Sequence, residues 1–383
     1  MLPKTAAALL SNIHTMKYHK ISFCTVCMNR TMHLKSTLLR NIEDNLHYPH
    51  LEYVLLNYGS KDDMHDWVQT HFDDYLQSGL LKYYRTDFPE VFKMSHAKNM
   101  AFRLATGDIL CSIDADNYTG DGFALYVNQL FRKDPAIFLA PPWIAPGKKW
   151  WDVQGRLCLW REDYYRFRGY DEGFIDYGYE DQDLKQRMMH AGLRKAVIRS
   201  TKFLQAIPHT DQLRMAGGIS RKLLANLLLS SIGRHEWELY YLRTDNTYEH
   251  YRLHAPQIRI EGAGTLYCSP AILTNVRLHP IDTGRYILHE KGLTLRDDNR
   301  QQPDDLVHHD AQTLRSLGGR LFYRLGPGSL MDQLLLHRSC YLGRQRLLQN
   351  RKEPYMVNAQ GFGEGAVTAM SGRKMPSFSF NTP

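Results

Sequence analysis

Two aspartates separated by one residue follow the apolar run Ile109–Ile113, and together they could bind a cation. Carboxylates two positions apart just beyond a strand, here Asp114 and Asp116, can converge on one hard ion. Mg²⁺ or Mn²⁺ takes oxygen ligands of this kind and keeps further positions open for diphosphate oxygens. Acidic pairs are common on protein surfaces, but a pair directly after a buried strand predicts a metal site.

A second acidic group, Glu180, Asp181 and Asp183, opens a segment whose apolar residues have helical spacing. Acidic residues in a first helical turn are favoured by the helix dipole, which is the purely structural explanation. Three acids in four residues exceed what capping needs, and a glycine- and aromatic-rich stretch precedes them. A carboxylate here could therefore act as a general base on an acceptor hydroxyl.

A histidine in the loop after the strand-like residues Ala196–Ile198 is the third candidate, His209. A loop histidine is more often a surface or packing residue than a ligand. With Asp114 and Asp116 already proposed as ligands, however, an imidazole would complete a protein ligand set for Mn²⁺. The role of His209 therefore depends on the two aspartates.

Strand-like and helix-like segments alternate from Lys20 to about Ile198, and this order must position the three groups. Buried strands are expected at Ile21–Met28, Tyr53–Leu56 and Ile109–Ile113, and helices at Arg30–Glu43 and His96–Ala105. The alternation predicts an α/β fold with a doubly wound sheet, which binds ligands at the carboxyl ends of its strands.

The pattern changes after Gly233. Short segments rich in β-branched and aromatic residues follow one another across Trp237–His289, which predicts a small antiparallel β unit ending in the polar linker Asp297–Asp305. Helical patterning resumes at Ala311–Leu317 and Leu330–Gln349. The apolar segment Leu223–Ile232 is expected to be a buried helix, with a helix resting on a membrane surface as the alternative.

The amino-acid composition limits the kinds of binding partner and the cellular compartment. Lysine and arginine outnumber the acidic residues by 48 to 40, but the basic residues are dispersed and no nucleic-acid-binding signature accompanies them, so we expect no nucleic-acid partner. Cys24 and Cys27 lie inside an apolar run, which indicates core thiols in a reducing compartment. Residues 1–17 hold no convincing cleavage site, and no apolar segment reaches the ~20 residues of a membrane span. We therefore expect a cytoplasmic protein and leave peripheral contact with the inner face of the membrane open.

Four segments, in this order and spacing, resemble the GT-A glycosyltransferases, specifically family 2 enzymes and relatives with a galactosyltransferase-like second half. They are the opening strand Ile21–Arg30, the turn Asn57–Asp62, the helix start Ser95–Asn99 that leads into the Asp-x-Asp strand, and the acidic segment Gly169–Leu184. The resemblance covers roughly Lys20 to Asp211, about half of the chain. It implies an N-terminal extension at 1–17, a GT-A catalytic domain at 18–233, a β-rich accessory unit at 234–305, and a helical segment and tail at 306–383 that packs back on the catalytic domain.

The resemblance also implies roles for individual residues. Asp116 is the main carboxylate on Mn²⁺ or Mg²⁺, Asp114 lies beside it, and His209 is a late ligand. Asp181 is the catalytic base. The residues implied around the nucleotide sugar are Thr25, Asn29, Arg30, Asn57, Asp62, His96, Lys98, Asn99, Asp114 and Ala115, and those around the acceptor are Trp150, Trp151, Tyr179 and Glu180. Core packing is the alternative for the two tryptophans.

The implied reaction moves a hexose or N-acetylhexosamine from a nucleotide sugar, a UDP-sugar in the first place, to a glycan or lipid-linked glycan. The chain departs from the family at Asn57 and Tyr58, where relatives carry an acidic residue or pair. A carboxylate there accepts the uracil N–H, and an asparagine carbonyl could accept the same bond more weakly. The acid at position 181 predicts inversion of the anomeric configuration.

Two other functions stay open at this point. A sugar-nucleotide-forming nucleotidyltransferase shares the α/β class, but Thr25–Lys35 lacks the glycine-rich basic loop that such enzymes carry. A non-catalytic glycan-binding protein could use a degenerate transferase scaffold. The presence of all four residues Asp114, Asp116, Asp181 and His209 argues against that, because a binding protein would not need them.

Overall fold

The computed structural model describes residues 17–87, 90–144, 151–261, 265–268, 273–298, 303–352 and 356–370. The chain divides into two compact units. The first unit contains residues 1–173, 180–208 and 350–383, and the second contains 174–179 and 209–349. Each unit has its own hydrophobic core, and they are described separately.

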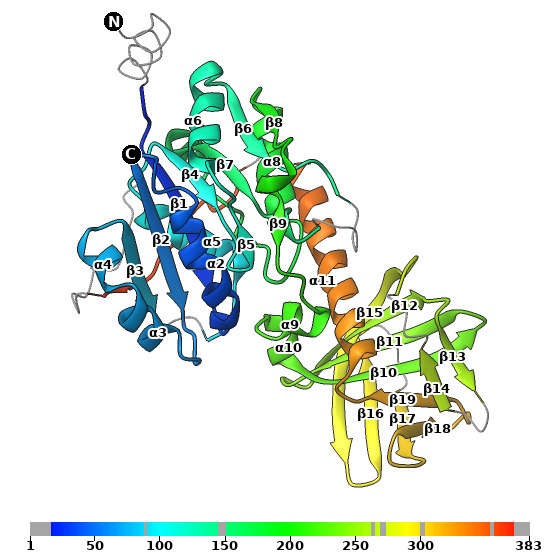
Figure 1. The fold of residues 1–383 in the computed structure, drawn as a ribbon. Helices are drawn as coiled ribbons and strands as arrows, with labels where there is room; N and C mark the ends of the chain where they lie inside the picture. The colour runs from blue at the N-terminus through cyan, green and yellow to red at the C-terminus, as the bar shows by residue number, and fades with distance from the viewer. Residues whose placement is uncertain are drawn as a thin grey trace, which may run out of the picture. The chain divides into compact units, whose positions relative to one another are not determined.

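The first unit is built on an eight-stranded sheet with the order β20-β3-β2-β1-β4-β7-β6-β8 (Figure 1). Strands β3, β2, β1 and β4 run parallel, whereas β7 is antiparallel to both of its neighbours. The strands are β1 (Ile21–Cys27), β2 (Leu51–Tyr58), β3 (Leu81–Thr86), β4 (Ile109–Ser112), β6 (Ile137–Ala140), β7 (Leu157–Trp160), β8 (Arg194–Val197) and β20 (Thr368–Ala369). A separate pair joins β5 (Asn117–Tyr118) to β9 (Gln205–Ala206).

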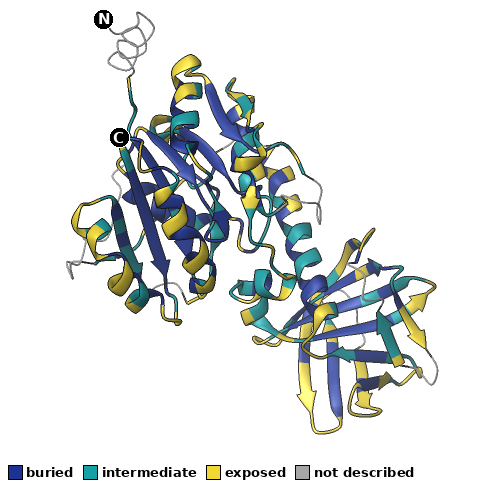
Figure 2. Ribbon diagram, in the orientation of Figure 1, coloured by how far each residue is buried: buried dark blue, intermediate teal, exposed yellow. Residues whose placement is uncertain are grey.

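Helices cover both faces of this sheet, because its central strands are apolar on both sides (Figure 2). In β1, Ile21 and Phe23 enter one core cluster while Cys24 and Val26 enter the other. The first cluster takes side chains from α2 (Thr31–Glu43), α3 (Met64–His71) and α6 (Phe123–Lys133). The second takes side chains from α5 (Met94–Leu104), α7 (Arg161–Arg166) and α8 (Glu180–His190). The short helix α4 (Asp73–Gln77) precedes β3. The predicted doubly wound α/β fold is therefore confirmed.

The C-terminal residues 356–369 lie on the first unit. Strand β20 pairs antiparallel with β3, with Thr368 opposite Arg85. The Arg168 side chain donates to the carbonyl oxygens of Val357 and Asn358. This segment therefore extends the sheet at its β3 edge.

The second unit is a closed antiparallel barrel of eight strands (Figure 1). Its strands are β10 (Leu224–Gly233), β11 (Glu236–Arg243), β12 (Thr247–His254), β15 (Arg277–His289), β16 (Gly292–Asp297), β17 (Asp304–His308), β18 (Thr313–Ser316) and β19 (Leu321–Leu325). A hairpin of β13 (Ile258–Glu261) and β14 (Thr265–Cys268) and the helices α9 (Asp211–Met215), α10 (Ile219–Leu223) and α11 (Ser329–Asn350) complete the unit. Every strand of the barrel contributes to the interior, through residues such as Leu228, Tyr240 and Leu306. Helix α11 packs Met331, Leu334 and Leu335 against outward-facing residues of β10, β11 and β12.

The additional antiparallel β unit is confirmed, but two local predictions within it are wrong. Leu223–Ile232 was expected to be a helix, and Leu224–Gly233 is strand β10. Leu228 faces the barrel interior while Leu227 and Leu229 face α11, so this strand is apolar on both sides and its pattern resembles that of a buried helix. Because these leucines are buried, the membrane-surface alternative for the segment is excluded as well.

The second wrong prediction is Ala311–Leu317, which was expected to be helical. Its residues Thr313–Ser316 form β18, one of the short strands that close the barrel. The strands of the barrel accordingly extend from Leu224 to Leu325, beyond the predicted limits of 234 and 305 on both sides. No helix of the part of the chain that the structure describes has the length and hydropathy needed to cross a membrane.

Candidate active site

The two aspartates of the Asp-x-Asp pair lie at the carboxyl end of β4, beside the end of β1. The Ile113 amide donates to the Cys24 carbonyl at 2.9 Å, and the Asn117 amide donates to the Asp114 carbonyl at 2.9 Å, which fixes the turn that follows the strand. Asp116 is only 5% exposed, and its Oδ1 accepts a bond of 2.8 Å from Asn117 Nδ2. The strand end therefore holds the pair in a fixed place.

The acidic group at 180–183 begins helix α8, and a buried lysine from α5 lies against it. Lys98 Nζ is 3.1 Å from Glu180 Oε1 and 2.9 Å from Asp181 Oδ1. Lys98 is 3% exposed, and its Nζ also lies 5.1 Å from the centre of the Tyr170 ring. Burial would lower the pKa of Lys98, but the surrounding carboxylates raise it well above its usual value, so the lysine stays charged.

The pKa values show that the two acidic groups share one electrostatic environment. Burial raises the pKa of Asp114 to about 6, Lys98 opposes this rise, and the negative charges of Asp116 and Asp181 add to it. Burial and the charge of Asp181 likewise raise the pKa of Glu180 to about 7. Burial also acts to raise the pKa of Asp181, but the positive charges of Lys98 and Lys185 outweigh it and lower that pKa. Glu180 and Asp181 therefore differ in proton affinity although they are neighbours in the chain.

Whether these residues fit a divalent cation follows from their chemistry. Asp114 and Asp116 are hard oxygen ligands, and a cation would offset both the burial and the repulsion from Asp116 that raise the pKa of Asp114. Among the residues that the structure describes, no group of three His, Cys, Asp or Glu side chains is gathered to hold a metal. By their own chemistry the two aspartates fit a hard cation, which also accepts diphosphate oxygens and water as ligands.

Two residues that the sequence did not single out lie behind the aspartates. Gly155 is so close that a Cβ atom there would be 2.4 Å from Asp114 Oδ2. The fully buried Arg156 donates through Nη2 to the Tyr118 carbonyl at 2.8 Å, and burial lowers its pKa to about 10 although Asp114 and Asp116 act to raise it. No motif in the sequence identifies either position, because the pairing of β7 with β4 brings both residues close to the aspartates.

The loops that follow β1 and β2 are tied together at the same edge of the sheet. Asn29 donates its amide to Ser60 Oγ at 2.9 Å and accepts from the Lys61 amide at 2.6 Å. Asp62 Oδ2 accepts from the Thr31 amide at 2.9 Å and so satisfies one of the free N–H groups at the start of α2. Asn29 and Asp62 are exposed, as donor-binding residues would be, and Arg30 and Thr25 are half-buried.

Asn57, at the end of β2, is buried and hydrogen-bonded within the protein. It is 1% exposed, its Oδ1 accepts from the Ser60 amide at 2.9 Å, and its Nδ2 donates to the Tyr83 hydroxyl at 2.8 Å. The buried side chain thus fixes the turn after β2, and its hydrogen bond to a uracil N–H stays a prediction.

Three further residues that were predicted at the donor site are buried or hydrogen-bonded within the protein. Both ring nitrogens of His96 are occupied, Nδ1 by the Tyr58 hydroxyl at 2.7 Å and Nε2 by the Glu364 carbonyl at 2.8 Å. Asn99 is fully buried and joins α5 to the Tyr170 backbone. Ala115 is 8% exposed, so only its backbone contributes at the turn. The polar atoms of His96 and Asn99 thus bond within the protein, and their roles as donor ligands stay predictions.

The remaining predicted residues cannot be placed at this site. Trp150 lies outside the described residues, and so does the side chain of Trp151. His209 and Tyr179 belong to the second unit. Their roles as metal ligand and acceptor contact stay predictions.

Comparison with known proteins finds one family model that matches part of the chain. Residues 22–189 match the model of the family described as Glycosyl transferase family 2. None of the curated proteins matches the chain significantly.

Several solved structures resemble parts of the chain. One is the mannosyltransferase PcManGT from Pyrobaculum calidifontis in complex with GDP-Man and Mn²⁺, with 21% identity over 50% of this chain and 58% of that chain, at a TM-score of 0.40. Another is Staphylococcus aureus TarS 1–349 with UDP-GlcNAc, with 13% identity, 50% and 62% coverage and a TM-score of 0.37. GalNAc-T7 with UDP, GalNAc and Mn²⁺ has 13% identity, 83% and 81% coverage and a TM-score of 0.41. The alignments with the first two span about three fifths of those chains.

Proposed function

From the match of residues 22–189 to the model of glycosyl transferase family 2, we propose that the protein transfers a sugar from a nucleotide-sugar donor to a hydroxyl of a glycan. The observation that carries the proposal is the convergence of two acidic groups. Asp114 and Asp116 end β4, Glu180 and Asp181 begin α8, and buried Lys98 joins the second pair within the same electrostatic environment. Such a site can bind a diphosphate through a cation and accept a proton nearby.

The proposed reaction is a single displacement. A carboxylate at the start of α8 takes the proton of the acceptor hydroxyl, whose oxygen forms the new bond to the anomeric carbon. The bond from that carbon to the donor's phosphate oxygen breaks, and the nucleoside diphosphate leaves with the electron pair. Attack from the face opposite the leaving group inverts the configuration.

The residues divide this work between them. Asp181, ionised because Lys98 and Lys185 lower its pKa, is the proposed base, and Glu180 holds the acceptor. Asp114 and Asp116 hold Mn²⁺ or Mg²⁺, with His209 as a further proposed ligand. A bound cation of this kind supplies positive charge that stabilises the departing diphosphate.

The donor is proposed as a hexosyl or N-acetylhexosaminyl nucleotide. Among the similar structures, PcManGT is in complex with GDP-Man and TarS is in complex with UDP-GlcNAc. Guanine and uracil nucleotides thus both occur in proteins that resemble this chain. Because the Asn57 amide is buried, exposed Asp62 and the backbone of the β1 and β2 loops are further candidates for a choice of UDP.

The test is a screen of nucleotide sugars with the full chain, in the presence of Mn²⁺ and after chelation. The expected result is metal-dependent release of nucleoside diphosphate from one donor, for which Asp116→Asn needs far more metal than wild type. A product with the opposite anomeric configuration to the donor, seen by NMR before mutarotation, would support inversion. Consumption of a nucleoside triphosphate with a sugar phosphate, and no turnover of any nucleotide sugar, would refute the proposal in favour of a nucleotidyltransferase.

A further inference from the structure

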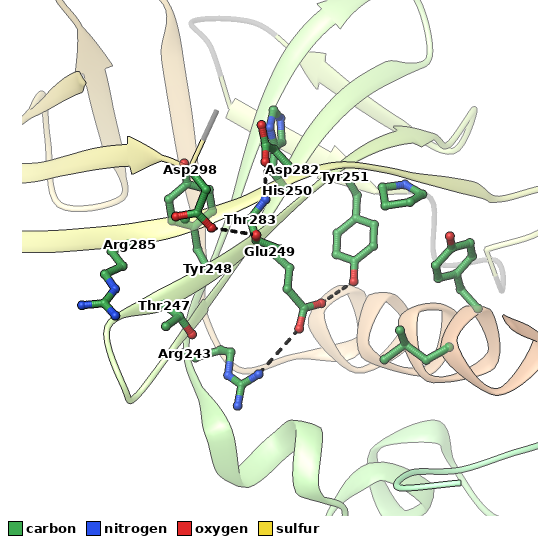
Figure 3. Close-up of a pocket in the computed structure, with 14 residues that line it drawn as sticks. Arg243, Thr247, Tyr248, Glu249, His250, Tyr251, Asp282, Thr283, Arg285 and Asp298 are labelled. Atoms are coloured by element: carbon green, nitrogen blue, oxygen red, sulfur yellow. Dashed lines mark hydrogen bonds and ion pairs between the residues drawn. The ribbon is translucent and has the colours of Figure 1, made fainter. Parts of the chain in front are cut away.

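The second unit contains a pocket of about 520 Å³ between strands β12 and β15 and helix α11 (Figure 3). Its size lies within the range of small-molecule binding pockets. All the residues that line it belong to the second unit, so it is separate from the acidic residues of β4 and α8. The family match ends at residue 189 and does not reach it.

An irregularity in strand pairing opens this pocket. His250 pairs with Asp282 and the next residue, Tyr251, pairs with Pro280, so Ile281 is left over as a bulge in β15. A bulge bends its strand away from regular pairing. Tyr341 and Leu342 of α11 line the same pocket, so the helix closes one side of the hollow.

One wall of the pocket is a carboxylate in a fixed orientation. Glu249 accepts two bonds from Arg338, at 2.9 Å from Nε and 2.5 Å from Nη2, and a third from the Tyr251 hydroxyl. Burial acts to raise the pKa of Glu249, but Arg338 outweighs it and lowers that pKa, so the group stays ionised. Arg338 itself lies over the Tyr241 ring at 4.0 Å. A hydrogen-bond acceptor held in this way loses little entropy when a ligand binds.

A second wall is aromatic and apolar. The rings of Tyr251 and Tyr341 meet edge to face at 6.1 Å between their centres. Tyr251 is buried, whereas Tyr341 is partly exposed and Pro280 is exposed. Such rings offer flat apolar faces for the C–H groups of a sugar, and a tyrosine adds a hydroxyl at its edge.

The charges in the pocket select the class of ligand. Three carboxylates, Glu249, Asp282 and Asp298, line it together with two arginines, Arg243 and Arg285. Arg243 is already close to acids, at 3.9 Å from Glu249 and 3.4 Å from Asp245. An anionic ligand would meet an excess of carboxylates, and an apolar ligand would displace water from these charged groups without replacing its hydrogen bonds.

A neutral ligand with many hydroxyl groups satisfies both walls. We infer that this pocket binds a neutral oligosaccharide, which is the acceptor or a neighbouring part of it. Only the acceptor role rests on the proposed function, since binding itself depends on the second unit alone. The barrel would then hold the glycan while the first unit transfers sugar to it.

Binding is measured by saturation-transfer NMR on the full chain. The probes are a panel of neutral tri- and tetrasaccharides, with sialyllactose as the anionic probe. Two variants alter the pocket. Thr283→Arg fills it from an exposed strand position whose hydroxyl donates to Asp298 at 2.9 Å, and Tyr341→Ala removes the partly exposed ring. The matched controls, Thr265→Arg and Tyr267→Ala, lie on β14 outside the pocket. Donor hydrolysis is measured for every variant.

We expect a neutral probe to bind. Both pocket variants should weaken its binding about tenfold or more, and both controls should bind it as wild type does. Binding of no neutral probe, unchanged binding by Thr283→Arg, or preference for sialyllactose would overturn the inference. Donor hydrolysis without pocket-dependent glycan binding would refute this inference alone. Pocket-dependent binding by a protein that hydrolyses no donor would refute the proposed function alone.

Discussion

Lys98 Nζ lies 2.9 Å from Asp181 Oδ1, and the lysine is 3% exposed while the aspartate is 17% exposed. The proposed base is therefore ion-paired before any substrate binds. An ion pair out of solvent is costly to break by removing one partner, because the other charge is left buried and unpaired. The pair also keeps Asp181 ionised at pH values where an isolated buried carboxyl would take up a proton.

Replacing this lysine tests the pair. Lys98→Met should lower the free energy of unfolding by about 3 kcal/mol, because Glu180 and Asp181 lose their shared cation. It should also move the acid limb of the activity profile to higher pH, since both carboxylates then hold protons more tightly. Lys35→Met is the matched control, because its ion pair with Asp63 is exposed and its loss should change stability far less. A stable Lys98→Met with an unshifted profile would contradict the role of the pair.

Substitutions of the two neighbouring acids, Glu180 and Asp181, should change different kinetic constants. Asp181→Asn should lower kcat for transfer by roughly 10²–10⁴, as loss of a general base does. Glu180→Gln should mainly raise the acceptor KM. In wild type, kcat/KM should fall as the pH drops through about 7, where burial causes Glu180 to take up a proton, and Glu180→Gln should remove this limb. If Glu180→Gln instead loses kcat and Asp181→Asn keeps it, the two roles are reversed.

Much of the site could be predicted because its residues follow recognisable elements. Asp114 and Asp116 come after a continuous apolar strand, and Glu180 and Asp181 come where helical spacing begins. The ends of the strands at one edge of a doubly wound sheet lie together. The order of the elements therefore predicted that these residues lie at the same edge.

What the sequence could not predict has a common physical cause. A side chain's direction depends on neighbours that are distant in sequence. His96 bonds to the Glu364 carbonyl and Asn99 to the Tyr170 backbone, and neither partner is indicated by local pattern. In the barrel, β10 is covered on both faces, so it has no alternation to distinguish it from a helix. The polar short strand β18 likewise gave too weak a signal to identify the barrel.

Gly155 provides a test of how closely Asp114 is packed. In Gly155→Ala the new methyl group would meet Asp114 Oδ2 at 2.4 Å, so the carboxylate must move. We expect the Mn²⁺ concentration for half-maximal activity to rise about tenfold, because small displacements of binding groups are costly in rate. The melting temperature should change little. Gly326→Ala is the control, because nothing lies within 4 Å of a Cβ there. Equal metal response in both variants would show that Asp114 does not hold the cation.

Metal dependence itself can be assigned to the Asp-x-Asp pair. Chelation should abolish donor hydrolysis, and added Mn²⁺ or Mg²⁺ should restore it in wild type. Asp116→Asn should keep the fold but need far more metal, because an amide oxygen is a weaker ligand for a hard cation than a carboxylate. Asp108→Asn, close to the same strand but exposed, should respond to metal as wild type does. Activity that survives thorough chelation would rule out the proposed cation.

Stability in acid should depend on Glu52, a residue remote from the chemistry. It is 2% exposed and accepts bonds from Ser22 at 2.6 Å, Lys82 at 2.7 Å and the Thr106 amide at 2.6 Å. Burial alone would raise its pKa, but these bonds outweigh burial and lower the pKa to about 2. Because the folded pKa is below the unfolded value, Glu52 stabilises the first unit fully above pH ~4.5. This contribution, about 3 kcal/mol, should be lost as the pH falls from about 4.5 to about 2.

The measurement is urea unfolding of wild type and Glu52→Gln from pH 7 to pH 2.5. The variant should be less stable at pH 7, since Lys82 keeps no ionised partner, and it should lose about 3 kcal/mol less on acidification. Glu43→Gln, at the exposed end of α2, should follow wild type within about 0.5 kcal/mol. Parallel acid curves for wild type and Glu52→Gln would mean that Glu52 titrates alike in the folded and unfolded chain, and would contradict the stabilising role of its buried bonds to Ser22 and Thr106.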